Sequence, residues 1–199
     1  PYLTACTGLD ALTHAIEAFV SNAHSPVTDL HALEAIRLLA SNLVPSIAEP
    51  DNVAMRSNVM LGSLEAGLAF SNAILGAVHA MAHSLGGLLD LAHGECNAIL
   101  LDHVIAFNFR AAAERYVRIG EAMGLDLRGM NLREKKSSIL TDLARLKRAA
   151  GIERTLARLG VHRTDVPNLT QKAIKDPCMV TNPRWASSRD IEVVYEEAL

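Results

Sequence analysis

Apolar residues recur three and four positions apart along almost the whole chain, and this spacing limits the folds that the chain can adopt. Side chains three and four residues apart lie on one face of an α-helix, so each run predicts a helix with one buried face. No segment shows the apolar–polar alternation of a strand. The sequence predicts an all-α fold, a single multi-helix domain over residues 1–199. The expected helices are 9–19, 30–43, 53–69, 78–89, 99–107, 112–123, 133–150 and 190–199.

Proline and glycine mark the expected ends of these helices. Pro45 and Pro50 follow one apolar run, and this helix is expected to end there because proline lacks the amide hydrogen that a helix interior needs. The pair Gly86-Gly87 is expected to break or bend its helix, and a new helix is expected to begin at His93. Such a break would let His93 fold back towards His79.

Composition and charge exclude several classes of protein. Half of the 199 residues are hydrophobic and 21% are charged, which is the composition of a chain with a buried core. The net charge is −3, and the Lys- and Arg-rich stretch 128–163 has no interleaved aromatic side chains, so no nucleic-acid partner is expected. No apolar run approaches the ~20 residues of a membrane span. With no secretory signal and no disulfide framework, the expected location is the cytoplasm.

Four of the eight histidines stand at spacings that suit a metal site. Asp10 and His14 are four residues apart, so they are expected to share one face of a helix. His79 and His83 have the same spacing among small apolar residues, and His93 follows beyond the glycine pair. One carboxylate and several imidazoles can hold one divalent cation. The spacing leaves open whether His79 pairs with His83 or with His93.

Structural roles would explain the same residues without a metal. An aspartate early in a helix interacts favourably with the helix dipole, and a buried imidazole needs only a hydrogen-bond partner. Cys6, Cys96 and Cys178 show no C-x-x-C spacing, which argues against a cysteine-type zinc site. Nitrogen and oxygen donors would suit Fe(II), Zn, Co, Ni or Mn. The chain also lacks the G-x-G-x-x-G, P-loop and G-x-S-x-G motifs.

The sequence resembles the iron-containing alcohol dehydrogenase family at these residues. The similarity is carried by residues 4–18 (TACTGLDALTHAIEA), by residues 76–97 and by Asp176-Pro177-Cys178. It covers the all-helical C-terminal domain of that family, which also resembles the helical domain of dehydroquinate synthase. The resemblance implies that an N-terminal nucleotide-binding domain would lie before Pro1 and is absent from this chain, which begins without Met.

The resemblance also implies roles for individual residues. The divalent metal, usually iron and sometimes zinc, would be bound by Asp10, His14, His79 and His93. His83 matches the histidine beside the nicotinamide and the substrate, outside the ligand set, and is the expected catalytic and cofactor-binding residue. Phe70 and Cys178 match positions that line the substrate pocket.

The implied reaction is hydride transfer between NAD(P) and a small primary alcohol or aldehyde, with the metal polarising the oxygen. The family often forms homo-oligomers, and the isolated domain is expected to be inactive without the nucleotide-binding domain. Two other hypotheses remain at this point. In the first, the chain is a non-catalytic metal-binding module. In the second, it is a structural helical domain whose histidines belong to the core.

Three positions depart from the family pattern. Phe19 stands where the family often has Tyr, and Ala92 precedes His93 where Pro is common. Asp102 stands at a usual Pro position. Loss of Pro at position 92 is expected to loosen the loop that positions His93. Asp102 is expected either to support the site as a nearby acid or simply to be exposed.

Overall fold

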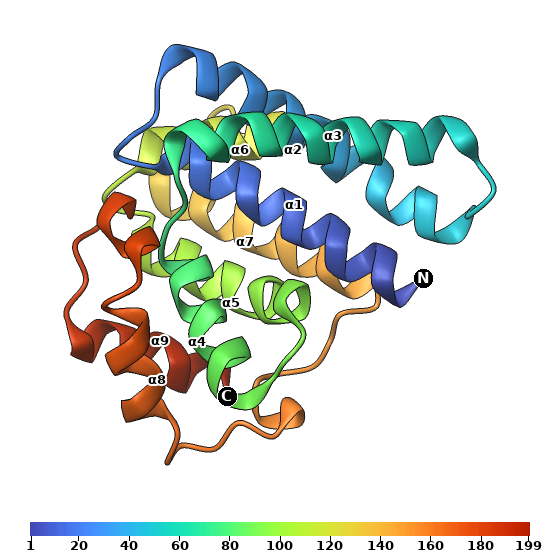
Figure 1. The fold of residues 1–199 in the computed structure, drawn as a ribbon. Coiled ribbons are helices and arrows are strands. Elements are labelled where there is room, and N and C mark those ends of the chain that lie inside the picture. The colour runs from blue at the N-terminus through green and yellow to red at the C-terminus, as the bar shows by residue number, and fades with distance from the viewer.

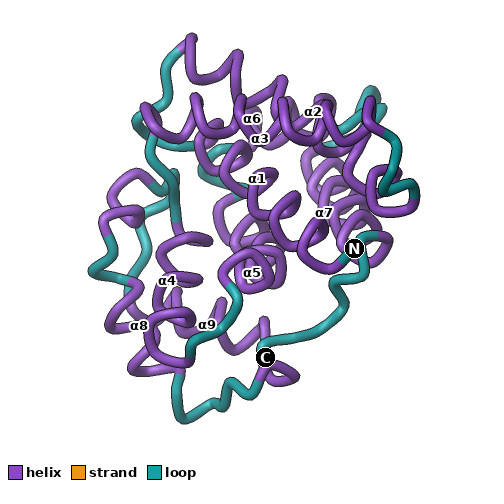
Figure 2. Tube along the Cα trace, turned by 45° about the vertical axis from the view of Figure 1, so that its right-hand side comes forward, coloured by secondary structure: helices purple, strands orange, loops and turns teal.

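The computed structural model describes residues 1–199 and contains α-helices, two short 3₁₀ helices and no strand (Figures 1 and 2). The all-α prediction is confirmed. The α-helices are α1 (Tyr2–Val20), α2 (Pro26–Ala48), α3 (Val53–Ala73), α4 (Ala77–Leu89), α5 (His93–Asn108), α6 (Ala113–Ala122), α7 (Leu132–Ala149), α8 (Val166–Ala173) and α9 (Ser188–Ala198). The 3₁₀ helices are η1 (Ala157–Leu159) and η2 (Pro177–Thr181).

The prediction that a helix ends at Pro45 is wrong. Helix α2 runs through Pro45 and ends at Ala48, because a proline so close to the C-terminus removes only one hydrogen bond and its own carbonyl still accepts from Glu49. Helix α4 covers the expected range 78–89 and is not broken at Gly86-Gly87. The break comes at Asp90, in the left-handed region with φ +54°. The prediction that a helix begins at His93 is confirmed.

Short polar motifs fix the starts of several helices. Ser25 and Thr28 form a reciprocal capping box at the start of α2, and Ser187 and Asp190 form one at the start of α9. Each box satisfies amide groups that have no partner inside the helix. The start of α4 is different, because Gly76 precedes it and offers no side-chain cap. Its first amides must find partners elsewhere in the molecule.

Helix α1 lies at the centre of the fold. It packs against α2 and α3 on one side and against α5 on the other (Figure 1). Helices α4 and α9 pack against α5, and α8 packs against both α4 and α9. One hydrophobic core of 49 buried residues joins these groups. The central position of α1 places one of its faces beside both α4 and α5, which is where the candidate site forms.

The turn between α3 and α4 bends the chain by 99°. Ile74 in this turn has φ +59°, a region that a β-branched residue rarely adopts. Thr181 stabilises the turn, because its Oγ1 donates to the carbonyl of Leu75 at 2.6 Å. No single helix is long and apolar enough to cross a membrane. Only α3 and α4, taken together across this bend, have the length and apolar composition of a membrane span.

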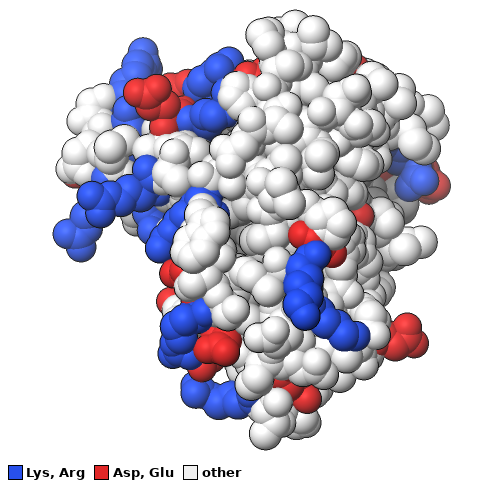
Figure 3. Space-filling model, turned by 60° about the vertical axis from the view of Figure 1, so that its left-hand side comes forward, with Lys and Arg blue, Asp and Glu red and all other residues white.

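Four of the ten basic residues of the stretch 128–163 form ion pairs, namely Arg128, Arg145, Lys147 and Arg154. Lys147 lies 2.6 Å from Asp102, and Arg154 lies 2.6 Å from Glu95. On the face shown in Figure 3, Lys and Arg side chains form several separate groups, with acidic side chains beside many of them. Asp102, expected near the candidate site, therefore takes part in the contact between α5 and α7.

Candidate metal centre

Three helices bring one carboxylate and three imidazoles together. Asp10 and His14 come from α1, His79 comes from α4, and His93 is the first residue of α5. Oδ1 of Asp10 lies 3.7 Å from Nε2 of His79 and 3.6 Å from Nε2 of His93. Ligand atoms of Asp10, His14 and His79 all lie within 4.8 Å of one another. The sequence spacing is compatible with His79 pairing with either His83 or His93, and the structure places His79 and His93 beside Asp10.

A glycine allows the start of α5 to approach α1 this closely. A Cβ at Gly94 would lie 2.6 Å from the carbonyl oxygen of Cys6 and 2.9 Å from its carbonyl carbon. Both atoms belong to the backbone of α1, so they cannot move aside as a flexible side chain would. A larger residue at position 94 would push the start of α5 away from α1. Gly94 thus permits the contact between His93 and Asp10.

Glu17, on the same face of α1, fixes the orientation of His79. Its carboxylate is 4% exposed and lies 2.6 Å from Nδ1 of His79. The same carboxylate accepts hydrogen bonds from the amides of Val78, at 2.7 Å, and of His79. Glu17 therefore caps α4 and engages Nδ1 of His79. The remaining ring nitrogen, Nε2, is the one that faces Asp10.

The charges at the centre shift the pKa values of its members. Burial raises the pKa of Asp10, but the imidazoles of His79, His14 and His93 and the hydrogen bond from Asn97 outweigh it and bring the pKa to about 2. Burial also opposes the charged form of His79, yet Asp10 and Glu17 raise its pKa to about 9. Burial and the charge on His79 lower the pKa of His14 to about 4.

Asn97 lies in the middle of this group, and its amide cannot donate a hydrogen bond to every neighbouring side chain. Nδ2 of Asn97 lies 2.5 Å from Oδ1 of Asp10, 3.1 Å from Nε2 of His79 and 3.0 Å from Nε2 of His93. An amide nitrogen has only two hydrogens for these three atoms. Oδ1 of Asn97 is buried and has no hydrogen-bond partner. A divalent cation among the carboxylate and imidazoles would take up the lone pairs that the amide leaves, so these residues fit a metal.

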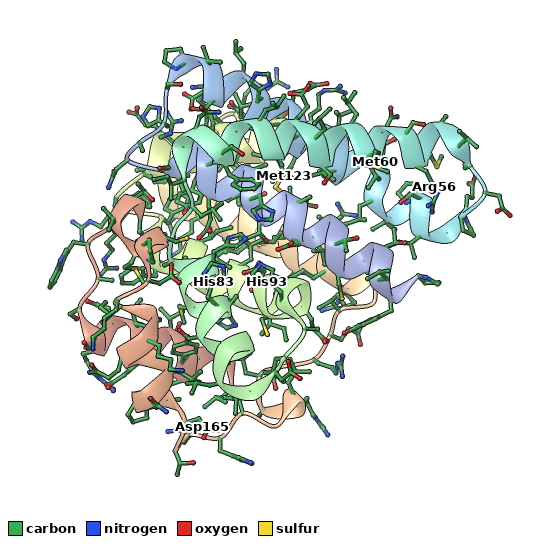
Figure 4. All side chains as sticks on the ribbon, viewed as in Figure 1. Arg56, Met60, His83, His93, Met123 and Asp165 are labelled. Atoms are coloured by element: carbon green, nitrogen blue, oxygen red, sulfur yellow. The ribbon has the colours of Figure 1, made fainter.

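One side of the cluster is open. His79 is buried, but the side chains of His93 and His83 are 42% and 44% exposed. The rings of His83 and His93 stack with 5.4 Å between centroids, and both are labelled in Figure 4 between α4 and the start of α5. Nδ1 of His83 lies 2.9 Å from Oδ2 of Asp176. A half-open arrangement is what a metal centre that binds an outside molecule needs.

The two expected pocket residues lie on different sides of the cluster. Phe70, on α3, stacks on the ring of His14 with 4.5 Å between centroids. Cys178, on η2, lies beside His83 and Asp176, and its Sγ and their ligand atoms are all within 4.8 Å of one another. The structure therefore brings all seven expected residues into one region.

Sequence reasoning missed three residues of this region. Glu17 lies seven residues after Asp10, and Asn97 lies four residues after His93. These are the helical spacings that singled out the histidines, so the same rule extended to amides and further carboxylates would have found both. Asp176 is 93 residues away from His83 along the chain, and no local pattern indicates this pairing.

Comparison with known proteins gives one consistent family. The sequence profile of the Fe-containing alcohol dehydrogenase family, C-terminal, matches residues 4–199. The 1,3-propanediol dehydrogenase of Klebsiella pneumoniae is 43% identical over 196 residues, which are 98% of this chain and 51% of that protein. The NAD-dependent methanol dehydrogenase of Bacillus methanolicus is 36% identical over 197 residues, covering 99% of this chain and 52% of that protein.

Solved structures give the same result. A crystal structure of 1,3-propanediol oxidoreductase matches with a TM-score of 0.97 and 43% identity, covering 100% of this chain and 52% of that chain. The chain spans about half the length of the curated relatives that it matches.

Proposed function

This chain belongs to the Fe-containing alcohol dehydrogenase family, and we propose that it forms the metal-binding, catalytic domain of an NAD(P)-dependent dehydrogenase. The reaction would interconvert small primary alcohols and aldehydes. One observation carries the proposal. A carboxylate and three imidazoles from α1, α4 and α5 converge on one half-open cluster, although no hydrogen bond joins the imidazoles to one another.

The metal would be held by Asp10, His14, His79 and His93. Nitrogen and oxygen donors without thiolate suit both Fe²⁺ and Zn²⁺. Of the two, we propose Fe²⁺, because the matching family is described as Fe-containing. When bound, the divalent ion supplies Lewis acidity towards the oxygen of the alcohol or aldehyde. Asp10 contributes the negative charge that retains the cation, and neutral imidazoles leave it electrophilic.

His83 would move the proton between substrate and solvent. Asp176 engages Nδ1 of His83, which leaves Nε2 free to exchange a proton. Its side chain is 44% exposed, so solvent can reach the ring, and it stacks on His93 at the edge of the cluster. Phe70 and Cys178 would line the substrate pocket on the two sides of the cluster.

The cofactor would be held largely outside this chain. One relative, about twice as long as this chain, is an NAD-dependent methanol dehydrogenase. This similarity supports NAD(P) as the hydride carrier. We therefore propose a nucleotide-binding domain in the part of the protein that precedes residue 1. Assembly into homo-oligomers is a further part of this proposal.

Two substitutions in the full-length protein test the proposal. His79→Ala is expected to lose both bound metal and NAD-dependent oxidation of 1,3-propanediol, because it removes a buried ligand. His83→Ala is expected to keep stoichiometric metal and lower kcat by about 10²–10⁴-fold, the usual range for a proton-transfer group. The exposed His162 gives a control, since His162→Ala should change neither quantity.

The outcomes separate the competing functions. A wild-type protein that binds the metal but shows no dehydrogenase activity under any condition would indicate a non-catalytic metal-binding module. A wild-type protein that binds no divalent metal would indicate a structural helical domain. An unchanged kcat in His83→Ala would contradict the role assigned to that histidine.

A further inference from the structure

The carboxamide of Asn97 is the one hydrogen-bond partner of two candidate ligands. Oδ1 of Asp10 accepts a hydrogen bond from Nδ2 of Asn97 at 2.5 Å. Nε2 of His79 and Nε2 of His93 lie 3.7 and 3.6 Å from the same Oδ1 atom, which is beyond hydrogen-bond distance. Nε2 of His93 has Nδ2 of Asn97 as its only partner, at 3.0 Å. His79 is different, because Glu17 holds its ring from behind.

The position of Asn97 makes it a rigid support. It is completely buried and lies within α5, four residues after His93. Asp10 is 21% exposed and His93 is 42% exposed, so solvent alone would leave both side chains free to rotate. A carboxylate that rotates away takes its charge out of the cluster. The buried amide therefore prevents these two candidate ligands from turning towards solvent.

We propose that Asn97 is a positioning residue of the metal centre: its Nδ2 donates to Oδ1 of Asp10 and, together with its contact to His93, holds both side chains facing His79. Asn97 is not itself counted among the ligands. This inference rests on the proposed function, because it concerns the binding of a divalent cation. Supporting groups of this kind typically contribute 10–100-fold to metal affinity.

The test measures binding of Co²⁺ alone to the metal-free protein by its visible absorption. Asn97→Leu removes both polar atoms of the amide at nearly constant shape. It is expected to weaken Co²⁺ binding by about 10–100-fold and to change the d–d bands, because Asp10 and His93 lose their common partner. Asn97→Ala removes the amide without adding volume. It can be measured in the same way if the leucine variant does not fold, and the same weakening is expected.

A matched control separates positioning from general stability. Thr170, on α8, is the other buried side chain whose polar atom has no hydrogen-bond partner. Thr170→Val should change the urea midpoint of the metal-free protein without altering Co²⁺ affinity or its spectrum. The leucine and alanine variants of Asn97 should alter both the affinity and the spectrum.

Two failures are distinguishable. If folded Asn97 variants bind Co²⁺ as tightly as the wild type and with the same bands, the role of Asn97 is wrong and the metal centre stands. If the wild-type protein itself binds no Co²⁺, the proposed metal centre is wrong as well.

Discussion

A histidine can bind a metal through only one ring nitrogen at a time, and its neighbours decide which. At His79 that neighbour is Glu17, whose buried carboxylate lies 2.6 Å from Nδ1 and also caps α4. The carboxylate therefore does two things at once. It positions the helix that carries His79, and it directs Nε2 towards Asp10.

Replacing Glu17 with glutamine tests this orientation. Glu17→Gln keeps the shape but removes the charge, so metal affinity is expected to fall by about 10–100-fold. The measurement is a Zn²⁺ titration against a chelating indicator. Glu65→Gln is the matched control, since Glu65 pairs with His31 at 2.5 Å between α2 and α3, outside the cluster. Equal affinities for the Glu17 variant and the wild type would contradict the role of Glu17.

The thiol of Cys178 gives a prediction that does not depend on a metal. Burial, with the nearby charge of Asp176 and a hydrogen bond to it, raises the pKa of Cys178 to about 12. A raised pKa lowers the thiolate fraction at every pH below it, and the thiolate is the reactive form. Alkylation by iodoacetamide at pH 8 is expected to be at least about tenfold slower than that of a free cysteine peptide.

Asp176→Asn provides the counterpart to that measurement. It removes the negative charge that raises the pKa of Cys178, so alkylation should become faster. Peptide mass analysis identifies the modified cysteine, because Cys6 and Cys96 are also free but buried. Alkylation of wild-type Cys178 as fast as that of the peptide would show that the thiol is not suppressed.

Residue-level reasoning on the sequence succeeded where side chains follow helical spacing. Asp10 and His14 share a face of α1 as expected. It failed where the partner comes from a distant segment, as Asp176 does for His83. The sequence also gave no means to tell that His79 is buried while His93 is open, because exposure depends on how the helices pack.

At the scale of helices, the approach of α5 to α1 depends on the absence of a side chain at position 94. Gly94→Ala would place a Cβ 2.6 Å from the carbonyl oxygen of Cys6. The expected cost is about 1–3 kcal/mol in the free energy of unfolding, since the backbone of α1 must shift. Metal affinity should fall too, because His93 moves with the start of α5. Urea unfolding and a Zn²⁺ titration measure the two effects.

Gly87 is the control for this substitution. It lies inside α4, and a Cβ there would meet nothing within 4 Å. Gly87→Ala is expected to stabilise the protein by about 0.5–1 kcal/mol, because alanine loses less backbone freedom in a helix. If both alanine variants changed the stability equally, close packing at Gly94 would not be the cause.

Helix existence was predictable, and helix ends were less so. Periodicity found the long helices because each buries a continuous apolar face. Pro45 misled the prediction of where α2 ends, because a proline this close to the C-terminus of a helix removes only one hydrogen bond. The short helix α8 has too few turns to show a clear period and was not predicted.

At the scale of the molecule, one core joins α1, α2 and the elements around α5. Leu39 is fully buried in this core, whereas Leu64 is 59% exposed on α3. Leu39→Ala is expected to cost about 2–5 kcal/mol in the free energy of unfolding. Leu64→Ala should stay within about 0.5 kcal/mol of the wild type. Similar costs for the two variants, by urea unfolding, would contradict the arrangement of α2 and α3.

The central claim is that Asp10, His14, His79 and His93 hold one divalent metal. Anomalous scattering from crystals grown with Fe²⁺ or Zn²⁺ tests it most directly, together with elemental analysis of the His79→Ala variant. One anomalous peak is expected within bonding distance of all four side chains, and no stoichiometric metal is expected in the variant. A wild-type crystal without a peak at this cluster, or a His79→Ala protein that keeps one metal per chain, would contradict it.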